Sequence, residues 1–575
     1  MLGLLLFGVG LTSPLRAESV LYGVGGDFKG FDPVDAGDVE SAEQISRVFE
    51  GLLEYDYLVR PYRVVPRLAE ALPAITADNL MYTFQLKKGV RFSDDPCFPG
   101  GKGREVTADD FVYSLKRVLD PKLESQGSWI LENHVLGVPE WQKNGKFDAP
   151  LPGLTAPDRY TLQIKLAKPY PQLLWVLTMQ YAFVLPHEAL EHYKDDFRSH
   201  PVGTGPYRLK SWRRRYRIEY ERNPTFSGQN YPTEGAPGDK EAGLLADAGK
   251  PLPLIDRLVE YYVSEYYTLW QMFLGGHIFA GGLNKDYFEK AINTELGLTD
   301  ALKQRGIRLY KTPEMSSYYI AFNMNDPVVG VSTDPSVNAK RRKLRQAFAC
   351  AINVPKYCEV ITNNRSIPAN SPIPPGVPGH TDAPYAYRYD SARAKQLLAE
   401  AGYPAGKDAK GNPLRLTMIT GGAGSTDARQ AAEFYVDQLR AVGIELVVQP
   451  LSFSEYLRRE HDGNFQLAIA GWVIDYPDAE NFLKLFYGPN KAPGVNISSY
   501  QNAAFDKLYD QIAIMPDGPD RTAIYEKMAA LVMEDCPWAL LTYPLTYGLY
   551  QPWFQNYKPH AFPYPNSKFY KVLPH

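Results

Sequence analysis

The sequence predicts a mixed α/β protein with more than one lobe. Residues 414–419 form an apolar strand pattern, 427–441 an amphipathic helix and 444–448 a second strand, which together make a strand–helix–strand unit. The chain has 575 residues, enough for three or four domains of about 150 residues each. Its apolar fraction of 45% and charged fraction of 22% are typical of a soluble globular protein and exclude disorder, collagen and a membrane bundle.

Capping boxes and alternating segments define the elements of the first half. The box Ser41–Gln44 predicts a helix through Leu52, and the box Thr107–Asp110 predicts another that Asp120-Pro121 ends. Residues 80–93 predict a hairpin that turns near Lys88-Gly89. Further strands are expected at 20–25, 161–166, 207–210 and 216–221. The polar residues 227–253, rich in Gly and Pro, predict a surface loop.

The second half has a more regular pattern. Besides the strand–helix–strand unit, we expect buried strands at 318–323, 465–470 and 539–543, and helices at 344–351, 391–401, 502–513 and 521–534. Gly402 is predicted to cap the helix at 391–401, with Pro404 beyond it. No repeat at a fixed period and no low-complexity tract interrupts these elements.

The N-terminus predicts a signal peptide over residues 1–17. It holds an apolar run of about eleven residues, too short for the roughly 20 that span a bilayer. Leu15-Arg16-Ala17 is an imperfect cleavage site, and no Lys or Arg precedes the run, as if the true start codon lay upstream. The alternative is a buried N-terminal segment. The first cysteine is Cys97, so no thiol near the signal is placed to carry a lipid anchor.

The four cysteines leave their state open. Cys97, Cys350, Cys358 and Cys536 can pair in three ways, and Cys350 and Cys358 are the closest in sequence. One or two disulfides and four buried free thiols are equally compatible with these spacings.

Charge and motifs exclude several classes of function. Lys and Arg number 62 against 65 Asp and Glu, for a net charge of −3, so no basic field exists to bind nucleic acid. The basic clusters Arg213–Arg215 and 340–345 are interpreted as solvated surface. H-E-x-x-H, G-x-S-x-G, Walker and G-x-G-x-x-G motifs are absent, and the nearest histidine pair, His187 and His192, is spaced by five. We therefore expect no enzyme, no metal and no cofactor.

The segment Gly471–Asp478 is the candidate site, because it follows the strand predicted at 465–470. In open α/β sheets, ligands lie beyond the carboxyl ends of strands. Asp478 is explained as the N-cap of a helix over 479–486. Asp475 has two possible roles: an Asx-turn onto its own backbone, or the counter-ion of a buried ammonium beside Trp472.

Five motifs in order resemble the oligopeptide- and dipeptide-binding family of extracytoplasmic solute-binding proteins of ABC transporters. They lie across nearly the whole chain: Phe31-Asp32-Pro33 with Phe49-Glu50-Gly51-Leu52, Thr107 to Ser114, Gly203-Thr204-Gly205-Pro206-Tyr207 with Arg222-Asn223-Pro224, Ala321-Phe322-Asn323 with Leu344-Arg345-Gln346-Ala347, and Gly471 to Phe482. Each is moderately specific, and their common order makes chance resemblance improbable.

The resemblance implies a periplasmic-binding-protein-like fold of type II, with two lobes joined by two crossing strands and an extra domain inserted in the first lobe. Lobe I would comprise 18–65, 203–311 and 543–575, the inserted domain II 66–202, and lobe III 312–542. The ligand would lie between the lobes, which close over it as on a hinge.

The resemblance also implies the function and the site residues. The protein would be the substrate-binding component of an ABC importer: a soluble periplasmic monomer that binds an extended peptide and delivers it to membrane permease subunits. Asp475 would hold the α-ammonium of the peptide, bordered by Gly471, Trp472 and Val473. Across the cleft would lie Ala36, Gly37 and Asp38, and Tyr318 would contribute to a wall rich in the 40 tyrosines of the chain.

Two alternatives to a peptide receptor remain. Relatives with this fold bind metal complexes, haem, opines or sugars, so Asp475 alone does not establish a peptide ligand. A secreted hydrolase is a third hypothesis, although the sequence has no recognisable set of catalytic nucleophile and base. The chain also departs from the family at Gly275–Phe279, where an acidic residue is common, and in the length of the 227–253 insertion.

Overall fold

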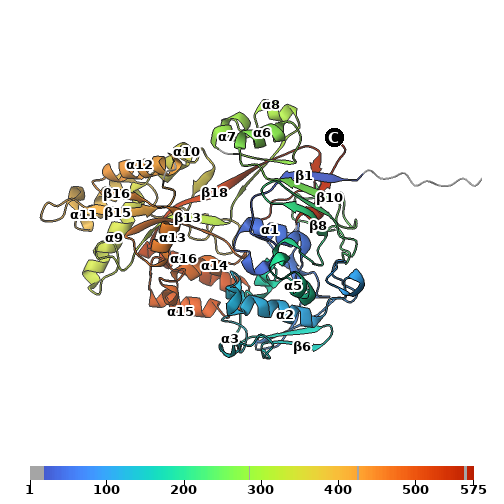
Figure 1. Ribbon diagram of the computed structural model, residues 1–575. Helices are drawn as coiled ribbons and strands as arrows, with labels where there is room; N and C mark the ends of the chain where they lie inside the picture. The colour runs from blue at the N-terminus through green and yellow to red at the C-terminus, as the bar shows by residue number, and fades with distance from the viewer. Residues whose placement is uncertain (1–17, 284, 424–425, 563–565) are drawn as a thin grey trace, which may run out of the picture.

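The chain folds into two lobes connected by long crossing strands (Figure 1). The computed structural model describes residues 18–283, 285–423, 426–562 and 566–575. The predicted signal peptide lies outside the described residues. In Figure 1, the body on the right holds the blue and green elements and the body on the left the yellow and orange ones.

A four-stranded sheet forms the centre of the first lobe. Its strand order is β1 (Val20–Val24), β10 (Arg257–Tyr261), β9 (Arg217–Arg222) and β8 (Tyr207–Arg213). Strand β1 runs parallel to β10, so the N-terminal strand lies beside a strand more than 200 residues further along the chain. The other two pairs of the sheet are antiparallel. Helix α1 (Val39–Val48) packs against β8, and a small antiparallel pair, β2 (Leu53–Tyr55) and β3 (Val64–Pro66), follows it.

The part of the chain between β3 and β8 forms a separate antiparallel sheet. Its order is β4 (Ala74–Ile75), β5 (Met81–Gln85), β7 (Thr161–Lys165) and β6 (Leu154–Asp158). Helix α2 (Ala108–Leu119) packs on β6 and β7. The remaining helices of this region are α3 (Val138–Asn144), α4 (Leu173–Val176) and α5 (His187–Tyr193).

The second lobe is built on an eight-stranded sheet. The main order is β11 (Ala280–Gly282), β18 (Trp538–Tyr550), β13 (Ser316–Phe322), β17 (Leu467–Val473), β15 (Arg415–Thr420) and β16 (Glu445–Pro450), while β12 (Arg308–Pro313) and β14 (Ser366–Pro368) also pair with β18. Its helices are α9 (Pro335–Ala351), α10 (Val354–Val360), α11 (Ser391–Glu400), α12 (Thr426–Arg440), α13 (Phe453–His461), α14 (Glu480–Leu483), α15 (Ala503–Ile512) and α16 (Pro519–Asp535).

Strand β18 belongs to both lobes. Residues 538–542 pair with β13, and residues 545–550 pair with β12, which connects back to the first lobe. Three helices, α6 (Tyr266–Leu274), α7 (Lys285–Ala291) and α8 (Asp300–Gln304), precede β12 and pack beside the far end of β18. The arrangement is the mixed α/β, two-lobed fold that the sequence predicts. The boundaries of its domains stay predictions.

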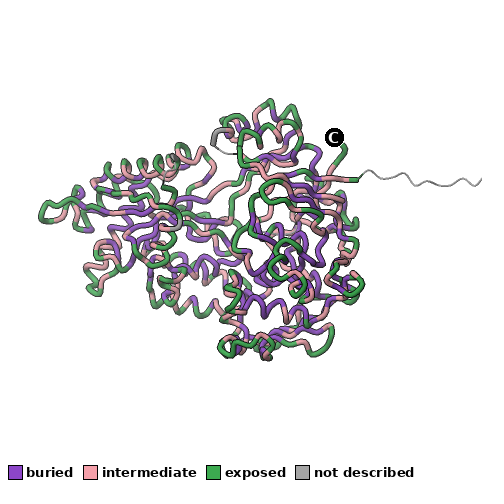
Figure 2. The backbone as a smooth tube through the Cα atoms, viewed as in Figure 1, coloured by how far each residue is buried: buried purple, intermediate pink, exposed green. Residues whose placement is uncertain are grey.

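Buried residues form three apolar clusters. One fills the second lobe and continues into the first lobe at Tyr55, Tyr57 and Leu58, a second fills most of the first lobe together with the β4–β7 sheet, and a small third cluster lies under α6–α8. Figure 2 shows the buried chain concentrated in the sheets and the exposed chain in outer turns and helices.

Most predicted elements are present, with two corrections. The first helix begins at Val39, two residues before the expected box, because the carboxylate of Asp38 accepts hydrogen bonds from the backbone N–H and the hydroxyl of Ser41, both at 2.8 Å; it ends at Val48, short of the expected Leu52. The hairpin predicted for 80–93 is wrong: β5 pairs with β4 and β7, and β7 lies some 80 residues further along the chain. A local pattern shows that β5 is a strand but not which strand pairs with it.

The cysteines and the basic cluster at 340–345 are also settled. The structure holds Cys97, Cys350, Cys358 and Cys536 as free thiols. The solvated-surface interpretation is wrong for Arg345. This residue is only 2% exposed, and its guanidinium donates to the backbone carbonyls of Val329, Asp535 and Cys536. Burial lowers the pKa of Arg345 to about 10.

Within the described chain, no helix is both long and apolar enough to cross a bilayer.

The 227–253 insertion is not merely a surface loop. Two of its carboxylates, Asp239 and Asp247, are buried and hold the C-terminal segment. Asp239 pairs with Lys558 at 2.6 Å, and Asp247 accepts from Lys571 at 3.0 Å and from the side-chain amide of Asn556 at 2.9 Å. Burial alone would raise the pKa of Asp247, but its bonds to Lys250, Asn556 and Lys571 lower the pKa to about 2.

Replacing Asp247 tests whether the insertion braces the C-terminal segment. Asp247→Ala should lower the free energy of unfolding by about 2 kcal/mol, because it leaves the buried Asn556 amide without its acceptor and Lys571 without its counter-ion. Chemical denaturation measures the change. The matched control is Glu241→Ala, which removes an exposed acid of the same insertion and should leave stability unchanged. Equal stability of the two variants would contradict the bracing role.

Candidate ligand-binding cavity

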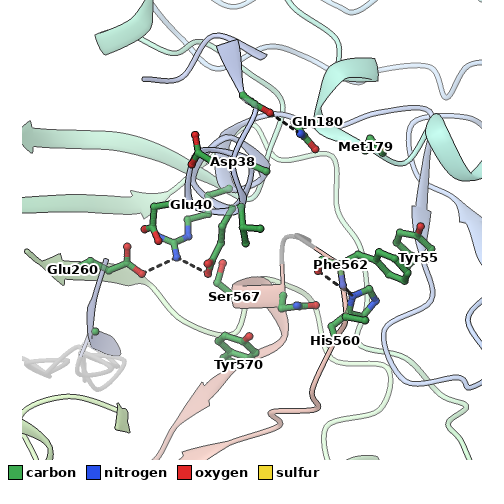
Figure 3. Close-up of a pocket in the computed structure, with 18 of the residues that line it drawn as sticks. Asp38, Glu40, Tyr55, Met179, Gln180, Glu260, His560, Phe562, Ser567 and Tyr570 are labelled. Carbon is green, nitrogen blue, oxygen red and sulfur yellow. Dashed lines mark hydrogen bonds and ion pairs between the residues drawn. The ribbon is translucent and has the colours of Figure 1, made fainter. Parts of the chain in front are cut away.

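A cavity of about 600 Å³ lies where the two lobes face each other. From the first lobe, β1, β10 and the stretch Ala36–Arg47 line it, and residues 178–181 lie beside them. From the second lobe come Val473, the last residue of β17, and the two residues after it, 474–475. The C-terminal segment supplies residues from Tyr557 to Tyr570 (Figure 3).

The loop Ala36–Asp38 is fixed from two sides. Its Ala36 carbonyl oxygen accepts hydrogen bonds from the amide of Gln180 at 3.1 Å and from the hydroxyl of Tyr181 at 2.6 Å. Its Asp38 carboxylate caps α1. The loop therefore presents a defined edge to the cavity.

Asp475 stands on the opposite side with one carboxylate oxygen in use. Oδ2 accepts from the side-chain amide of Asn481 at 2.8 Å and from the ammonium of Lys484 at 3.2 Å, while Asn481 Oδ1 accepts the backbone N–H of Asp475 at 3.0 Å. No hydrogen bond to Oδ1 occurs in the described chain, and the side chain is 32% exposed. The alternative of an Asx-turn is wrong, since the carboxylate bonds Asn481 and Lys484. Asp475 is thus held in one orientation with a free oxygen for a donor.

Lys484 is enclosed by aromatic rings. Its ammonium lies 5.2 Å from the ring centre of Trp472 and 5.5 Å from those of Tyr476 and Trp129. Trp129 belongs to the first body and the other two to the second, so the lysine contributes a cation–π contact between the lobes. The indole N–H of Trp472 donates to Asn481 Oδ1 at 2.8 Å. Trp472 therefore supports Asp475 indirectly, through Asn481 and Lys484.

Asp478 forms a second connection between the lobes. Its carboxylate accepts the backbone N–H of Glu480, the first residue of α14, at 2.9 Å and pairs with Arg521 at 2.9 Å. It also accepts from the amide of Gln172, of the first body, at 3.3 Å. The N-cap of α14 is Ala479, one residue after the predicted Asp478, and most of the partners of Asp478 come from elsewhere in the chain.

Acidic side chains from α1 and β10 gather at one end of the cavity. Arg47 pairs with Glu260 at 2.7 Å and with Glu43 at 3.1 Å. Gln44 donates to both Glu260 and Glu40, at 2.9 and 3.3 Å. The side chain of Glu43 is half exposed and lines the cavity. Burial is the largest cause that raises its pKa, and the charges of Glu260 and Glu40 add to the effect while Arg47 opposes it.

The other end of the cavity is aromatic. Tyr55 stacks on Phe562 with ring centres 4.9 Å apart, and His560 packs edge-on against Tyr55 at 5.4 Å and Tyr62 at 4.8 Å. Part of His560 reaches the cavity, but the protein surrounds its ring on the other sides. Burial lowers the pKa of His560 to about 3, with a smaller contribution from the charge of Arg60. The imidazole is therefore neutral at physiological pH.

Five of the eight predicted site residues meet at this cavity. Ala36, Gly37, Asp38, Val473 and Asp475 line it, whereas Gly471, Trp472 and Tyr318 lie outside its lining. Tyr318 pairs with Gly471 across β13 and β17, further back on the sheet. Whether any of the eight binds ligand stays a prediction.

Sequence reasoning missed the acidic end and the C-terminal wall. The i, i+4 spacing of Glu43 and Arg47 could have indicated a pair on one helix face, but Glu260 lies more than 200 residues away and gave no signal. Across the described residues, no group of three His, Cys, Asp or Glu side chains is arranged to hold a metal ion.

The family follows from a match over most of the chain. Residues 63–494 match the family described as bacterial extracellular solute-binding proteins, family 5 Middle. The chain belongs to the bacterial extracellular solute-binding proteins of family 5. The two-lobed fold with ligand-sized cavity between the lobes is the arrangement expected of this family.

Curated relatives and solved structures agree with this membership. Di/tripeptide-binding protein 2 of Pseudomonas aeruginosa is 25% identical over 84% of this chain and 82% of its own, and heme-binding protein A of Haemophilus influenzae is 26% identical over 88% and 84%. The dipeptide-binding protein of Escherichia coli is 26% identical over 94% and 92%. The unliganded open form of the murein tripeptide-binding protein MppA superposes with a TM-score of 0.73 at 23% identity, covering 98% of each chain, which shows the shared fold.

The buried His560 makes a prediction about pH. In the unfolded chain a histidine takes a proton near pH 6.5, whereas folded His560 does so only near pH 3, so its contribution to stability falls as pH drops through this window. Between pH 7 and pH 5 the free energy of unfolding of wild type should decrease by about 2 kcal/mol more than that of His560→Gln. Denaturation at the two pH values measures this difference.

The control replaces an exposed histidine. His461→Gln, whose ring is 64% exposed, should show the pH dependence of wild type. If His560→Gln loses as much stability as wild type between pH 7 and pH 5, His560 is not buried as a neutral ring.

Proposed function

We propose that this protein is the substrate-binding component of an ABC importer that captures dipeptides or oligopeptides in the cavity between its lobes. The observation that carries the proposal is Asp475: a carboxylate at the cavity wall, oriented by Asn481 and Lys484, with Oδ1 directed to no protein donor in the described chain. A peptide α-ammonium is the donor that fits such an oxygen, since charge-assisted hydrogen bonds are stronger than neutral ones.

The chain around Asp475 suits an extended guest. Val473 and Asp475 stand at the end of β17, and the ordered loop Ala36–Asp38 faces them across the cavity. Exposed backbone at these edges can pair with the main chain of a peptide, which gives affinity without demanding a particular sequence. The relatives named for dipeptides and di/tripeptides support the same ligand class.

Transport follows from membership of the family. Binding would draw the lobes together about β12 and β18, and the closed form would dock on permease subunits in the membrane. We propose a periplasmic, exported monomer without catalytic activity. A purified sample that hydrolyses peptides or esters would contradict this last point.

A non-peptide solute is the second candidate, favoured by the similarity to heme-binding protein A. The charge of the cavity argues against haem, because its lining holds five carboxylates and Arg47 is its one Lys or Arg among the described residues. Two haem propionates would meet like charges there. Native mass spectrometry of the protein as purified would identify retained cargo and separate the two candidates.

Replacing Asp475 tests the proposed function. Asp475→Asn should weaken binding of peptides with a free α-ammonium at least tenfold, which corresponds to about 1.4 kcal/mol, because an amide lacks the charge that holds the ammonium. Isothermal titration calorimetry measures the affinity, and the melting temperature without ligand checks that the variant folds.

Two controls make the result specific. Asp462→Asn changes an exposed acid of the same lobe and should bind peptide as wild type does. N-acetylated peptides, which lack the ammonium, should bind wild type and Asp475→Asn equally. Unchanged affinity of Asp475→Asn for free peptides would remove Asp475 from the site, and failure of every peptide to bind would sink the proposed function.

A further inference from the structure

The cavity lining carries more negative charge than one ligand ammonium would neutralise. Asp38, Glu40, Glu43, Glu260 and Asp475 line the cavity, and Arg47 is the single guanidinium or ammonium among the described lining residues. His560 is neutral at physiological pH. Lys484 balances Asp475 from behind, so the surplus of negative charge lies at the α1 end.

Most of these carboxylates are already satisfied by the protein. Asp38 caps α1 with both oxygens, Glu40 accepts the backbone N–H of Gly26 at 2.8 Å, and Glu260 accepts from Arg47 and Gln44 with one oxygen each. Two acids keep a spare oxygen. Glu43 Oε1 accepts from Arg47, and Glu40 Oε1 accepts from Gly26 and Gln44, while Oε2 of each has no hydrogen bond in the part of the chain that is described. Of the two, Glu43 has the more exposed side chain at the cavity, so it is the acid at this end that a ligand can reach more readily.

The C-terminal turn facing Glu43 has unused polar atoms as well. Ser567 lines the cavity and is 7% exposed, yet its hydroxyl has no hydrogen-bond partner among the described residues, and the same holds for the buried Oδ1 of Asn566. Figure 3 draws Ser567 on the side of the cavity that Glu40 and Glu260 occupy, away from Tyr55. Buried polar groups without a partner are rare in folded proteins, which points to a partner that arrives with the ligand.

This acidic end is distinct from the position of Asp475. The charge of Glu43 helps to raise the pKa of Tyr570, which follows Ser567 in the C-terminal turn, whereas the charge of Asp475 helps to raise that of Tyr55 and, to about 12, that of Tyr181. In each case burial is the larger cause. Glu43 lies on α1 of the first lobe and Asp475 follows β17 of the second lobe, so the two carboxylates stand on different walls of one cavity.

We propose that the cavity selects peptides with two positive charges, the α-ammonium at Asp475 and a lysine or arginine side chain at Glu43, beside Ser567 and Asn566. The inference rests on the proposed function and narrows its substrate class. A basic side chain supplies the donors that the spare oxygens of Glu43, Ser567 and Asn566 can accept, and it offsets the surplus negative charge of the lining. An acidic side chain at the same place would be repelled.

The test compares tripeptides that differ only in charge. Lysine is placed in turn at each position of trialanine and compared with norleucine, which has a similar length without the ammonium. Calorimetry should give at least tenfold tighter binding for lysine than for norleucine in one or more positions, and glutamate at that position should bind more weakly than norleucine.

A variant locates the effect. Glu43→Gln keeps an oxygen for Arg47 but loses the charge, so it should lower the affinity of the preferred lysine peptide to near that of the norleucine peptide. Glu234→Gln, at an acid whose side chain is 74% exposed, should keep the full preference of wild type. Melting temperatures verify that both variants fold.

The outcomes separate this inference from the proposed function. Equal affinity for lysine and norleucine peptides, or a lysine preference that survives in Glu43→Gln, would overturn the dicationic ligand while leaving a peptide receptor in place. Absence of binding by any of the peptides, charged or neutral, would overturn the proposed function itself.

Discussion

The course of β18, which runs from the sheet of the second lobe to the core of the first lobe at Tyr550, is the constraint on which the rest of the structure depends. Its first residues complete the sheet of the second lobe through β13, and its last residues pair with β12, which returns to the first lobe. Backbone groups in such a ladder must stay paired, so the lobes are held together along a continuous strand. The cavity lies beside this connection, with residues 473–475 on one side and 36–38 on the other.

Preorganisation of charge explains how one wall of the cavity is prepared for a ligand. Asn481 and Lys484 fix the Asp475 carboxylate through Oδ2, and Trp472 fixes Asn481 in turn. Lys484 balances the charge of Asp475 when no ligand is bound, which lowers the free-energy cost of holding a partly buried carboxylate. At the opposite wall the Arg47, Glu43 and Glu260 triad uses the same principle but leaves a surplus of acid. The two walls are therefore not equivalent toward a cation.

The last residues of the chain close the cavity, and ionic contacts outside the cavity lining hold them in position. Lys558 and Lys571 are paired with Asp239 and Asp247 of the insertion, and the buried Lys568 is paired with Glu54 at 2.6 Å. Between these lysines lie His560, Phe562 and Ser567 of the cavity wall. An insertion that adds no residue to the cavity thus helps to set its shape.

The sequence by itself determined the kinds of element, the family and a candidate anchor. The strand–helix–strand unit of β15, α12 and β16, the capped helix α2 and the segment ending in Asp475 are local patterns, and periodicity, caps and motif order act over a few residues. Tertiary structure alone decided which segments meet. It paired β5 with β7 in place of a hairpin, buried Arg345 on backbone carbonyls, and set Lys484 behind Asp475. It also brought Glu260 and Ser567 to the cavity from opposite parts of the chain. Such contacts depend on how whole faces pack and which charges are desolvated together, and neither leaves a signature in neighbouring residues.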